Sequence, residues 1–262
     1  MSEQKIALVT GAARGIGRGI ALALPETGAI VHVTDREGRH HKQSQLPGTV
    51  EDTAEEVTAR GGTGIAHVVD HTNDQAVEEV FAQIGQRHGS LDLVIANAFN
   101  GNALPSGPGT FWELPMDHWA HMVDAGLRSH LVTTRHATPL LIERQGLLAF
   151  TGYTLPKNGS GHVFYDLAMT GITTLAASAA RDLTDHGVTA LAVSPGFTRT
   201  EAILAAFGDS PLPPGSDTVE HVGRVVTSLW DDPARTAFSG QTVTIADLTQ
   251  HYRVTEHENT QA

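Results

Sequence analysis

The 262-residue sequence contains no cysteine. This absence excludes disulfide bonds, thiolate metal sites and a cysteine nucleophile. The sequence also has no apolar run close to the length of about 18 residues that crosses a bilayer. Its first residues carry no secretory signal pattern and run directly into an apolar, β-rich segment. We therefore expect a cytoplasmic protein that does not enter membranes.

Basic residues are scarce. The chain has 17 Lys and Arg against 29 Asp and Glu, a formal net charge of −12. This balance argues against nucleic acid or an anionic membrane surface as a partner. A metal site is not expected either, because His118 and His121 have no acidic third ligand at fixed spacing. The length is sufficient for one large α/β domain with a sizeable core.

Short apolar runs alternate with segments of helical spacing along the whole chain. Strands are predicted at 5–10, 29–34, 64–69, 91–96, 147–150, 188–193 and 241–245. Helices are predicted at 15–24, 49–60, 73–88, 117–143, 163–185 and 218–231. This alternation predicts an α/β fold, a Rossmann-type doubly wound parallel sheet of seven strands flanked by helices. We expect a single domain over 1–250, loops at about 99–116 and 200–217 that contact substrate, and a polar tail over 251–262.

A glycine-rich turn follows the first predicted strand. Gly11, Gly15 and Gly17 lie between that strand and a helix, in the spacing Gly-x-x-x-Gly-x-Gly. Glycines let the backbone turn tightly and let a phosphate approach the amides, while the helix N-terminus adds positive potential. The turn therefore predicts a dinucleotide pyrophosphate site. The alternative is an ordinary glycine-rich turn between a strand and a helix.

An acidic residue stands at the end of the second predicted strand. Asp35 follows Gly11 by 24 residues, and a carboxylate there accepts hydrogen bonds from the adenosine ribose and repels a 2′-phosphate. This position favours NAD. Arg14 and Arg36 point the other way, because guanidinium groups can bind the extra phosphate, although both could equally be surface residues. The prediction is NAD, with NADP possible.

A tyrosine far along the chain completes a family resemblance. Tyr165 lies in His-Val-Phe-Tyr-Asp-Leu-Ala-Met near the start of an Ala-rich helix. With the glycine turn, it resembles the short-chain dehydrogenase/reductase family over roughly 5–245. The segments 14–21, 111–113 and 126–130 are most similar to the branch that includes dehydrogenase/reductase SDR family member 1. The resemblance implies a small-molecule substrate and a homodimer or homotetramer formed through two long central helices.

The resemblance also assigns positions around the nucleotide. Asp70 ends the third strand, where the family contacts adenine, and Asn97-Ala98 matches the family's Asn-Ala-Gly with Phe99 in place of glycine. The segment 195–200 matches the Pro-Gly-x-x-x-Thr that holds the nicotinamide carboxamide. The residues expected to bind the cofactor are Gly11, Arg14, Gly15, Ile16, Gly17, Asp35, Arg36, Asp70, His71, Asn97, Ala98, Tyr165, Pro195, Gly196, Thr198 and Thr200.

Three of the four catalytic positions of the family are changed. In the family, Tyr carries the hydroxyl proton, Lys lowers its pKa and binds the ribose, Ser orients the substrate oxygen, and Asn completes a proton relay. Tyr165 is present, but the positions of Lys, Ser and Asn hold Met169, Gly152 and Gly126. The resemblance therefore supports the fold and the nucleotide site better than it supports the chemistry.

Loss of the lysine has a calculable cost. A free tyrosine has a pKa of about 10, and a nearby ammonium lowers such a value by roughly one to three units. Met169 supplies no charge. Reduction suffers less than oxidation, because a neutral tyrosine is already the required acid. We expect Tyr165 as a weakened acid/base, Thr151 as the group that orients the substrate oxygen, and His162 as an added proton carrier, unless His162 is a solvated loop residue.

Three functions remain open at this point. The leading hypothesis is an NAD(P)-dependent oxidoreductase acting on a carbonyl/alcohol pair. The second is a non-redox enzyme on the same fold, such as a dehydratase, isomerase or cyclase, and the third is a nucleotide-binding pseudoenzyme. Aromatic residues at 111, 112 and 119 could line an apolar substrate pocket and 204–207 could close over it, or these residues could simply be packed.

Overall fold

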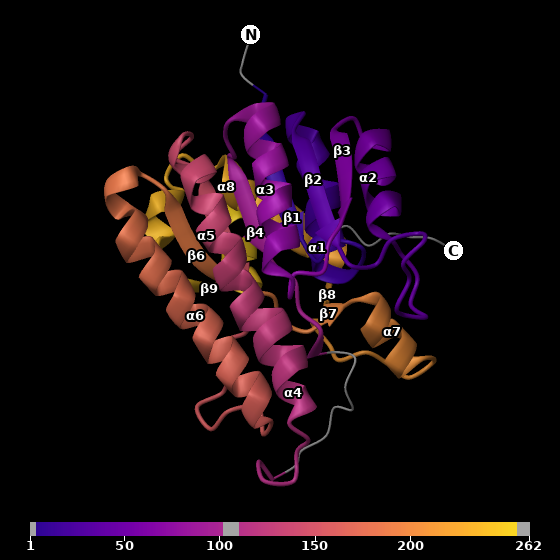
Figure 1. Cartoon of the computed structure of the whole chain (residues 1–262). Coiled ribbons are helices and arrows are strands. Elements are labelled where there is room, and N and C mark those ends of the chain that lie inside the picture. The colour runs from indigo at the N-terminus through magenta and orange to yellow at the C-terminus, as the bar shows by residue number, and fades with distance from the viewer. Residues whose placement is uncertain (1–3, 102–109, 256–262) are drawn as a thin grey trace.

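The strands form one continuous parallel sheet in the computed structural model, which describes residues 4–101 and 110–255 (Figure 1). Within these ranges seven strands pair in the order β3-β2-β1-β4-β5-β6-β9, which confirms the predicted doubly wound parallel sheet of seven strands. Their bounds are β1 (Ile6–Thr10), β2 (Ile30–Asp35), β3 (Thr63–Val68), β4 (Leu93–Ala96), β5 (Leu147–Thr151), β6 (Thr189–Ser194) and β9 (Thr242–Thr244). Another short parallel pair joins β7 (Thr198–Arg199) to β8 (Asp217–Thr218).

Helices cover both faces of this sheet (Figure 1). The α-helices of the described residues are α1 (Gly15–Ala23), α2 (Val50–Ala59), α3 (Asp74–His88), α4 (Asp117–Trp119), α5 (Ser129–Ile142), α6 (Val163–Leu183), α7 (Glu201–Phe207), α8 (Val219–Asp231) and α9 (Ile245–Tyr252). Successive residues of a strand point to opposite faces of the sheet and so belong to two separate hydrophobic cores. Ile6 and Leu8 pack with α3, α5 and α6, whereas Ala7 and Val9 pack with α1, α2, α8 and α9. A sheet covered on both faces needs apolar residues throughout its strands, which explains the near-continuous apolar runs.

Three elements differ from the sequence-based prediction. The helix predicted over 117–143 contains a wide π-helical stretch, Ala120–Arg128, between α4 and α5. The loop predicted over 200–217 contains α7, and α9 follows β9 immediately instead of a longer strand. Of the predicted loop 99–116 and tail 251–262, residues 102–109 and 256–262 lie outside the described part of the chain.

One helical stretch, Val163–His186, is long and apolar enough to cross a membrane by length and composition. In this fold it packs against the sheet, and Ile172 and Ala176 belong to the core beneath it. The core helix of a soluble protein passes the same test, so the stretch is explained by its place in the sheet's covering layer.

The carboxyl ends of the strands meet at one edge of the sheet. The strand order reverses between β1 and β4, where neighbouring connections leave toward opposite faces. Ligands of open α/β sheets bind in the crevice at such a switch point. Gly11, Asp35 and Asn97 all lie at this edge, at or just beyond the ends of β1, β2 and β4.

Candidate functional site

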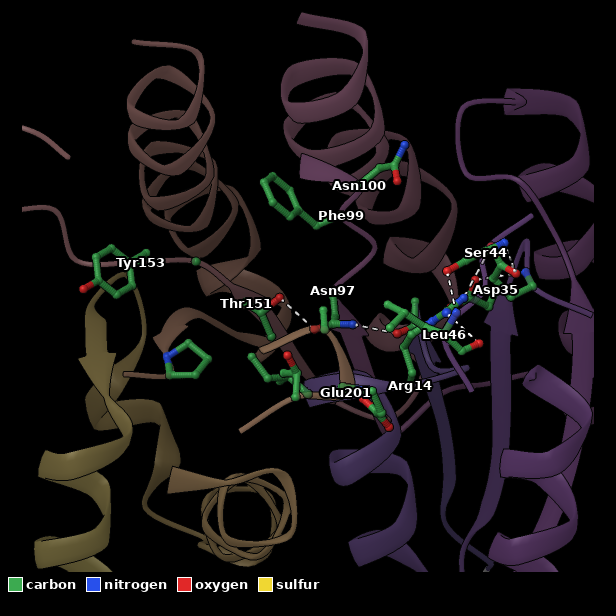
Figure 2. Close-up of a pocket in the computed structure, with 18 of the residues that line it drawn as sticks. Arg14, Asp35, Ser44, Leu46, Asn97, Phe99, Asn100, Thr151, Tyr153 and Glu201 are labelled. Atoms are coloured by element: carbon green, nitrogen blue, oxygen red, sulfur yellow. Dashed lines mark hydrogen bonds and ion pairs between the residues drawn. The ribbon is translucent and has the colours of Figure 1, made fainter. Parts of the chain in front are cut away.

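A cavity of about 450 Å³ opens at this edge of the sheet. Figure 2 shows Thr151 and Tyr153 toward one end, Asn97 between, and Arg14 and Asp35 toward the other. The lining residues are Gly11, Arg14, Gly15, Ile16, Asp35, Arg36, Glu37, Gln43, Ser44, Leu46, Asn97, Phe99, Asn100, His130, Thr151, Gly152, Tyr153, Tyr165, Met169, Ile172, Pro195, Gly196, Thr200, Glu201 and Ala202. The structure thus brings together residues that are far apart in sequence.

The glycine turn is shaped for close approach. Gly11 and Gly15 have φ angles of +65° and +59°, which favour glycine. A Cβ on Gly11 would lie 2.8 Å from the Ala98 Cα, and one on Gly17 would lie 2.4 Å from the Gly11 carbonyl oxygen. Neither position can therefore hold a side chain, and only backbone atoms of the turn face the cavity there.

An acidic side chain already uses one amide of this turn. The Gly15 N–H donates to Glu201 Oε2 over 2.7 Å, at the N-terminus of α1. The carboxylate occupies the kind of position that a phosphate oxygen takes at a helix N-terminus. The turn therefore fits an anion, and the residues around it fit the pyrophosphate of a dinucleotide.

Asp35 ends β2 and accepts two backbone hydrogen bonds. Its Oδ2 accepts from Ala13 N over 3.0 Å, and its Oδ1 accepts from Glu37 N over 3.1 Å. Burial raises the pKa of this carboxyl from its ordinary value, against the lowering effect of those two amides. The carboxylate lines the cavity where a ribose would follow the pyrophosphate.

The two arginines at this end of the cavity already have partners. Arg14 lies 3.3 Å from the buried Glu37 carboxylate, and its Nη1 donates to the Leu46 carbonyl oxygen over 3.4 Å. Arg36 Nη2 donates to Asn100 Oδ1 over 2.6 Å. Neither guanidinium stands free in the cavity.

A smaller cavity adjoins the first on the β3 side. Val69, Asp70, His71 and Thr72 line it. Asp70 Oδ1 accepts hydrogen bonds from the backbone N–H and hydroxyl of Thr72. His71 is buried, its Nε2 lies 2.7 Å from the Thr34 hydroxyl, and burial lowers its pKa to about 4. This is the region predicted to receive adenine.

Asn97 ties the strand ends together. Its Nδ2 donates to the carbonyl oxygens of Thr10 and Gly11 over 2.8 and 3.1 Å. Its Oδ1 accepts from the Thr151 hydroxyl over 3.1 Å, the contact drawn in Figure 2. The Asn97 side chain thereby fixes the glycine turn and the predicted substrate-orienting hydroxyl relative to each other.

Tyr165 lies in the first turn of α6 and lines the cavity with Met169, one turn further on. Burial, the nearby Tyr153 and Asp166 together raise the pKa of the Tyr165 phenol to about 12. Met169 is only 5% exposed and packs in the core below. The environment therefore holds Tyr165 in its neutral form, the opposite of what an adjacent ammonium does.

Gly126 and Gly152 both face apolar side chains. A Cβ on Gly126 would lie 2.9 Å from the Phe99 ring, and one on Gly152 would lie 3.3 Å from Ile172 Cγ2. Phe99 meets Tyr165 edge to face, with ring centroids 6.2 Å apart. Phe99 therefore fills the space into which a longer side chain at position 126 would project.

His162 does not line the cavity. Its Nδ1 accepts from the Tyr165 backbone N–H over 3.4 Å as the N-cap of α6, and its Nε2 lies 2.9 Å from His118 Nδ1. Burial and His118 lower its pKa. Both ring nitrogens are engaged, so a proton-carrying role at Tyr165 needs a rearrangement of this cap.

Of the other predicted site residues, some line the cavity and some do not. Pro195, Gly196 and Thr200 line the cavity, whereas Thr198 lies in β7 and donates its hydroxyl hydrogen to the Gly196 carbonyl oxygen. The aromatic side chains of Phe111 and Trp112 are 67% and 71% exposed and lie outside the lining. The structure therefore gives these two aromatics no place in the pocket.

Several lining residues have no sequence signal. Glu37, Gln43 and Ser44 lie after β2, between the predicted strand 29–34 and the predicted helix 49–60, where the sequence predicts no element. His130 is 1% exposed, and its ring centroid lies 6.2 Å from that of Phe150. Only its place one turn after Gly126, on the same helical stretch, could have indicated that it lies near the site.

Comparisons with known proteins identify the family of this chain. A family model described as Enoyl-(Acyl carrier protein) reductase matches residues 11–245. Dehydrogenase/reductase SDR family member 1 of Mus musculus is 31% identical over 95% of this chain and 82% of its own length. This relative lies in the branch that the sequence segments indicate. A 3-oxoacyl-(acyl-carrier-protein) reductase of Staphylococcus aureus is 30% identical over 93% of this chain and 97% of its own length.

A solved structure has the same fold. A short chain dehydrogenase from Mycobacterium thermoresistibile superposes with a TM-score of 0.84 over 95% of this chain and 88% of that chain, at 22% identity. At that identity the likeness bears on the fold alone.

Proposed function

We propose that this chain, which belongs to the short-chain dehydrogenase/reductase family, is an NAD-dependent oxidoreductase of a carbonyl/alcohol pair with atypical catalysis. Family membership makes it a short-chain oxidoreductase, and the family generally binds NAD(P) and acts on small molecules. The observation that carries the proposal is one continuous cavity that joins the anion-binding glycine turn to the Tyr165 phenol.

The residues present fit a dinucleotide along the length of this cavity. The turn at Gly11–Gly17 would hold the pyrophosphate, Asp35 the adenosine ribose, and the smaller cavity at Asp70 the adenine. The segment 195–200 would hold the nicotinamide end. When bound, the nicotinamide ring supplies or accepts the hydride.

Two observations support NAD over NADP. The carboxylate of Asp35 lines the ribose end of the cavity and would repel a 2′-phosphate. The guanidinium groups that could bind that phosphate are held by Glu37 and Asn100. A free ribose hydroxyl is the better match.

Tyr165 would act as a proton donor to a substrate oxygen. A phenol with a pKa of about 12 stays protonated at neutral pH, so it can donate to the alkoxide that forms during reduction but is a poor base for oxidation. The Thr151 hydroxyl donates to Asn97 and, as placed, can accept from an alcohol O–H. To assist carbonyl reduction, Thr151 would turn its O–H away from Asn97.

A second candidate is nucleotide binding without redox turnover. It is favoured by the raised pKa of Tyr165 together with the packed, uncharged surroundings of Met169, Gly152 and Gly126. These features leave the nucleotide half of the cavity unaffected.

We also propose a cytoplasmic homodimer or homotetramer. Leu131 on α5 and Leu167 on α6 are 53% and 50% exposed. Apolar side chains on the outer sides of these two long helices support an interface between copies of the chain.

The test is a panel of aldehydes, ketones and alcohols assayed with NADH, NADPH and their oxidised forms by absorbance at the nicotinamide band. We expect measurable carbonyl reduction with NADH and its loss in Tyr165→Phe. Tight NADH binding with no turnover in wild type, and turnover gained by Met169→Lys, would assign the binding role instead. A product formed with no absorbance change would indicate a non-redox enzyme.

A further inference from the structure

Arg14 is the positively charged residue within the glycine turn. It follows Ala13 directly and precedes Gly15, so its guanidinium projects from the turn itself into the ribose end of the cavity. Figure 2 shows it beside Asp35, Ser44 and Leu46. Taken alone, an arginine there favours the 2′-phosphate of NADP, because guanidinium binds phosphate with charge-assisted hydrogen bonds.

The buried carboxylate of Glu37 neutralises the positive charge of Arg14. Its side chain is 3% exposed, against 18% for Arg14, so the carboxylate lies beneath the guanidinium and away from solvent. Its Oε1 is 3.3 Å from Arg14 Nη2. A buried carboxylate normally requires such a partner, because an unpaired buried charge is strongly destabilising.

The loop after β2 holds Glu37 in place. Glu37 Oε2 accepts from the backbone N–H groups of Gln43 and Ser44 over 2.9 and 3.2 Å. The Glu37 carbonyl oxygen accepts from Val50 N at the start of α2. The carboxylate is therefore fixed at both oxygens, one toward the loop and one toward Arg14.

The same loop also closes over Arg14 from the other side. The Leu46 carbonyl oxygen accepts from Arg14 Nη1. Gly48 packs so closely that a Cβ there would lie 2.5 Å from the Ala13 carbonyl oxygen and 3.6 Å from the Arg14 Cβ. Arg14 is thereby oriented by two contacts and one close approach, all made by residues 37–48.

We propose that Glu37 is the residue that sets nucleotide choice in this chain, by neutralising and holding Arg14 so that it cannot bind a 2′-phosphate. Asp35 then acts alone on the ribose. The inference rests on the proposed nucleotide site. It adds a specificity-determining residue whose effect is exerted through another side chain, not by contact with the ribose.

The direct test is Glu37→Gln, with dissociation constants for NADH and NADPH measured by calorimetry. Glutamine keeps an oxygen for the amides of Gln43 and Ser44 but removes the charge opposite Arg14. We expect the preference for NADH over NADPH to fall at least about tenfold, the change that corresponds to roughly 1.4 kcal/mol. NADPH affinity should rise while NADH affinity changes little.

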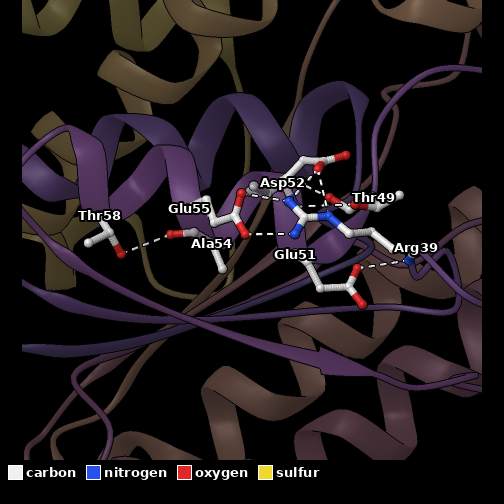
Figure 3. A network of polar contacts seen from close by, with 8 residues as sticks. Arg39, Thr49, Glu51, Asp52, Ala54, Glu55 and Thr58 are labelled. Atoms are coloured by element: carbon white, nitrogen blue, oxygen red, sulfur yellow. Dashed lines mark hydrogen bonds and ion pairs between the residues drawn. The ribbon is translucent and has the colours of Figure 1, made fainter.

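A matched control removes an equal charge from the surface nearby. Glu55 on α2 pairs with Arg39, and neither touches Arg14; Figure 3 shows this separate network with Asp52 and Glu51. Glu55→Gln should leave the NADH/NADPH ratio unchanged. Adding Arg14→Gln to Glu37→Gln should return the ratio toward the wild-type value, because the released guanidinium is then gone and Arg36 is still held by Asn100.

Arg14→Gln alone keeps the test decisive if Glu37→Gln does not fold. Because Glu37 already neutralises Arg14, the single variant should weaken NADPH binding less than about threefold relative to NADH. A larger selective loss of NADPH, or an unchanged ratio in folded Glu37→Gln, overturns the inference. If wild type binds neither nucleotide, the proposed function itself fails, and calorimetry distinguishes that outcome at once.

Discussion

At the scale of single residues, Phe99 and Gly126 are complementary. The related family has a glycine after Asn-Ala and an asparagine in the following helix; this chain has a large residue at the first position and the smallest at the second. The Phe99 ring lies where a Cβ at 126 would come within 2.9 Å of it. The large residue at 99 and the small one at 126 therefore depend on each other for packing.

Gly126→Asn should consequently destabilise the protein. Overpacking of this kind costs about 1 to 3 kcal/mol, and urea denaturation should show it as a lower midpoint at unchanged slope. The double variant Phe99→Gly, Gly126→Asn should be more stable than the sum of the two single changes predicts. Simple additivity would mean that the ring does not occupy that space.

Tyr165 leads to a prediction about pH. Alcohol oxidation needs the Tyr165 phenolate, and the pKa of this phenol is about 12. The kcat/KM for alcohol oxidation should therefore rise about tenfold per pH unit from pH 7 to 10, without a plateau. Reduction should be nearly independent of pH in that range. Met169→Lys should move a plateau into the range by lowering the Tyr165 pKa, at some cost in stability.

The uncharged variant Met169→Gln is the control, since it matches the length of the side chain but adds no ammonium. Its oxidation profile should still rise throughout. An oxidation rate in wild type that levels off below pH 9 would show that another group activates Tyr165.

At the scale of elements, the first residue of α7 contacts the glycine turn of the proposed nucleotide site. Thr200 caps this helix by accepting from Ile203 N, and the next residue, Glu201, accepts from Gly15 N. A dinucleotide pyrophosphate would compete with the Glu201 carboxylate for the same amide and be repelled by its charge. Nucleotide entry therefore requires the start of α7 to move or Glu201 to rotate.

Glu201→Gln should tighten NADH binding by about three- to tenfold, because glutamine does not repel the pyrophosphate. Direct titration of the purified protein measures it. Glu26→Gln is the matched control: Glu26 is exposed beyond the opposite end of α1, and its loss should have no effect. Weaker binding in Glu201→Gln would instead make Glu201 a ligand of the nucleotide.

The sequence predicts regular elements better than short ones. Strand runs such as Leu93–Ala96 are apolar because both faces are covered, so their period is easily recognised. The missed α9 had a signal in Thr244, whose hydroxyl caps the helix by accepting from the Asp247 backbone N–H and also donates to the Asp247 carboxylate. The missed α7 had Thr200 before it and Gly208 after it, but seven residues are too few for a helical period to stand out.

The residues of the candidate site also fall into those that the sequence predicts and those that it does not. The glycine turn and Asp35 are local patterns, and the sequence alone indicates both. The contacts Glu37–Arg14 and Glu201–Gly15 join residues 23 and 186 positions apart in the chain, and only the fold brings them together. No spacing rule relates such pairs.

At the scale of the whole molecule, several histidines are buried in uncharged form. Burial lowers the pKa of His32 to about 3, of His71 to about 4 and of His130 to about 3. His32 links two others, with Nδ1 2.9 Å from His67 and Nε2 3.1 Å from His88. In the unfolded chain each takes up a proton near pH 6.5, so acid favours unfolding.

The free energy of unfolding should therefore fall as pH drops from 7.5 to 5.5. The folded-state pKa values lie below the unfolded value, so this stability is present above pH 6.5 and is lost progressively below it. Each such histidine contributes up to about 1.4 kcal/mol per pH unit. Urea titrations at several pH values measure the slope.

His32→Asn should reduce the slope, whereas His40→Gln, which changes an exposed histidine, should leave it as in wild type. Equal slopes in all three proteins would mean that buried histidines do not account for the acid sensitivity.

The packing around Met169 also limits which side chains this part of the cavity accepts. Met169 is part of the core, Ile172 backs Gly152, and the Phe99 ring fills the space beside Gly126. A lysine at 169 or an asparagine at 126 would meet an apolar environment. Any catalytic gain from such a substitution would therefore come with a loss of stability.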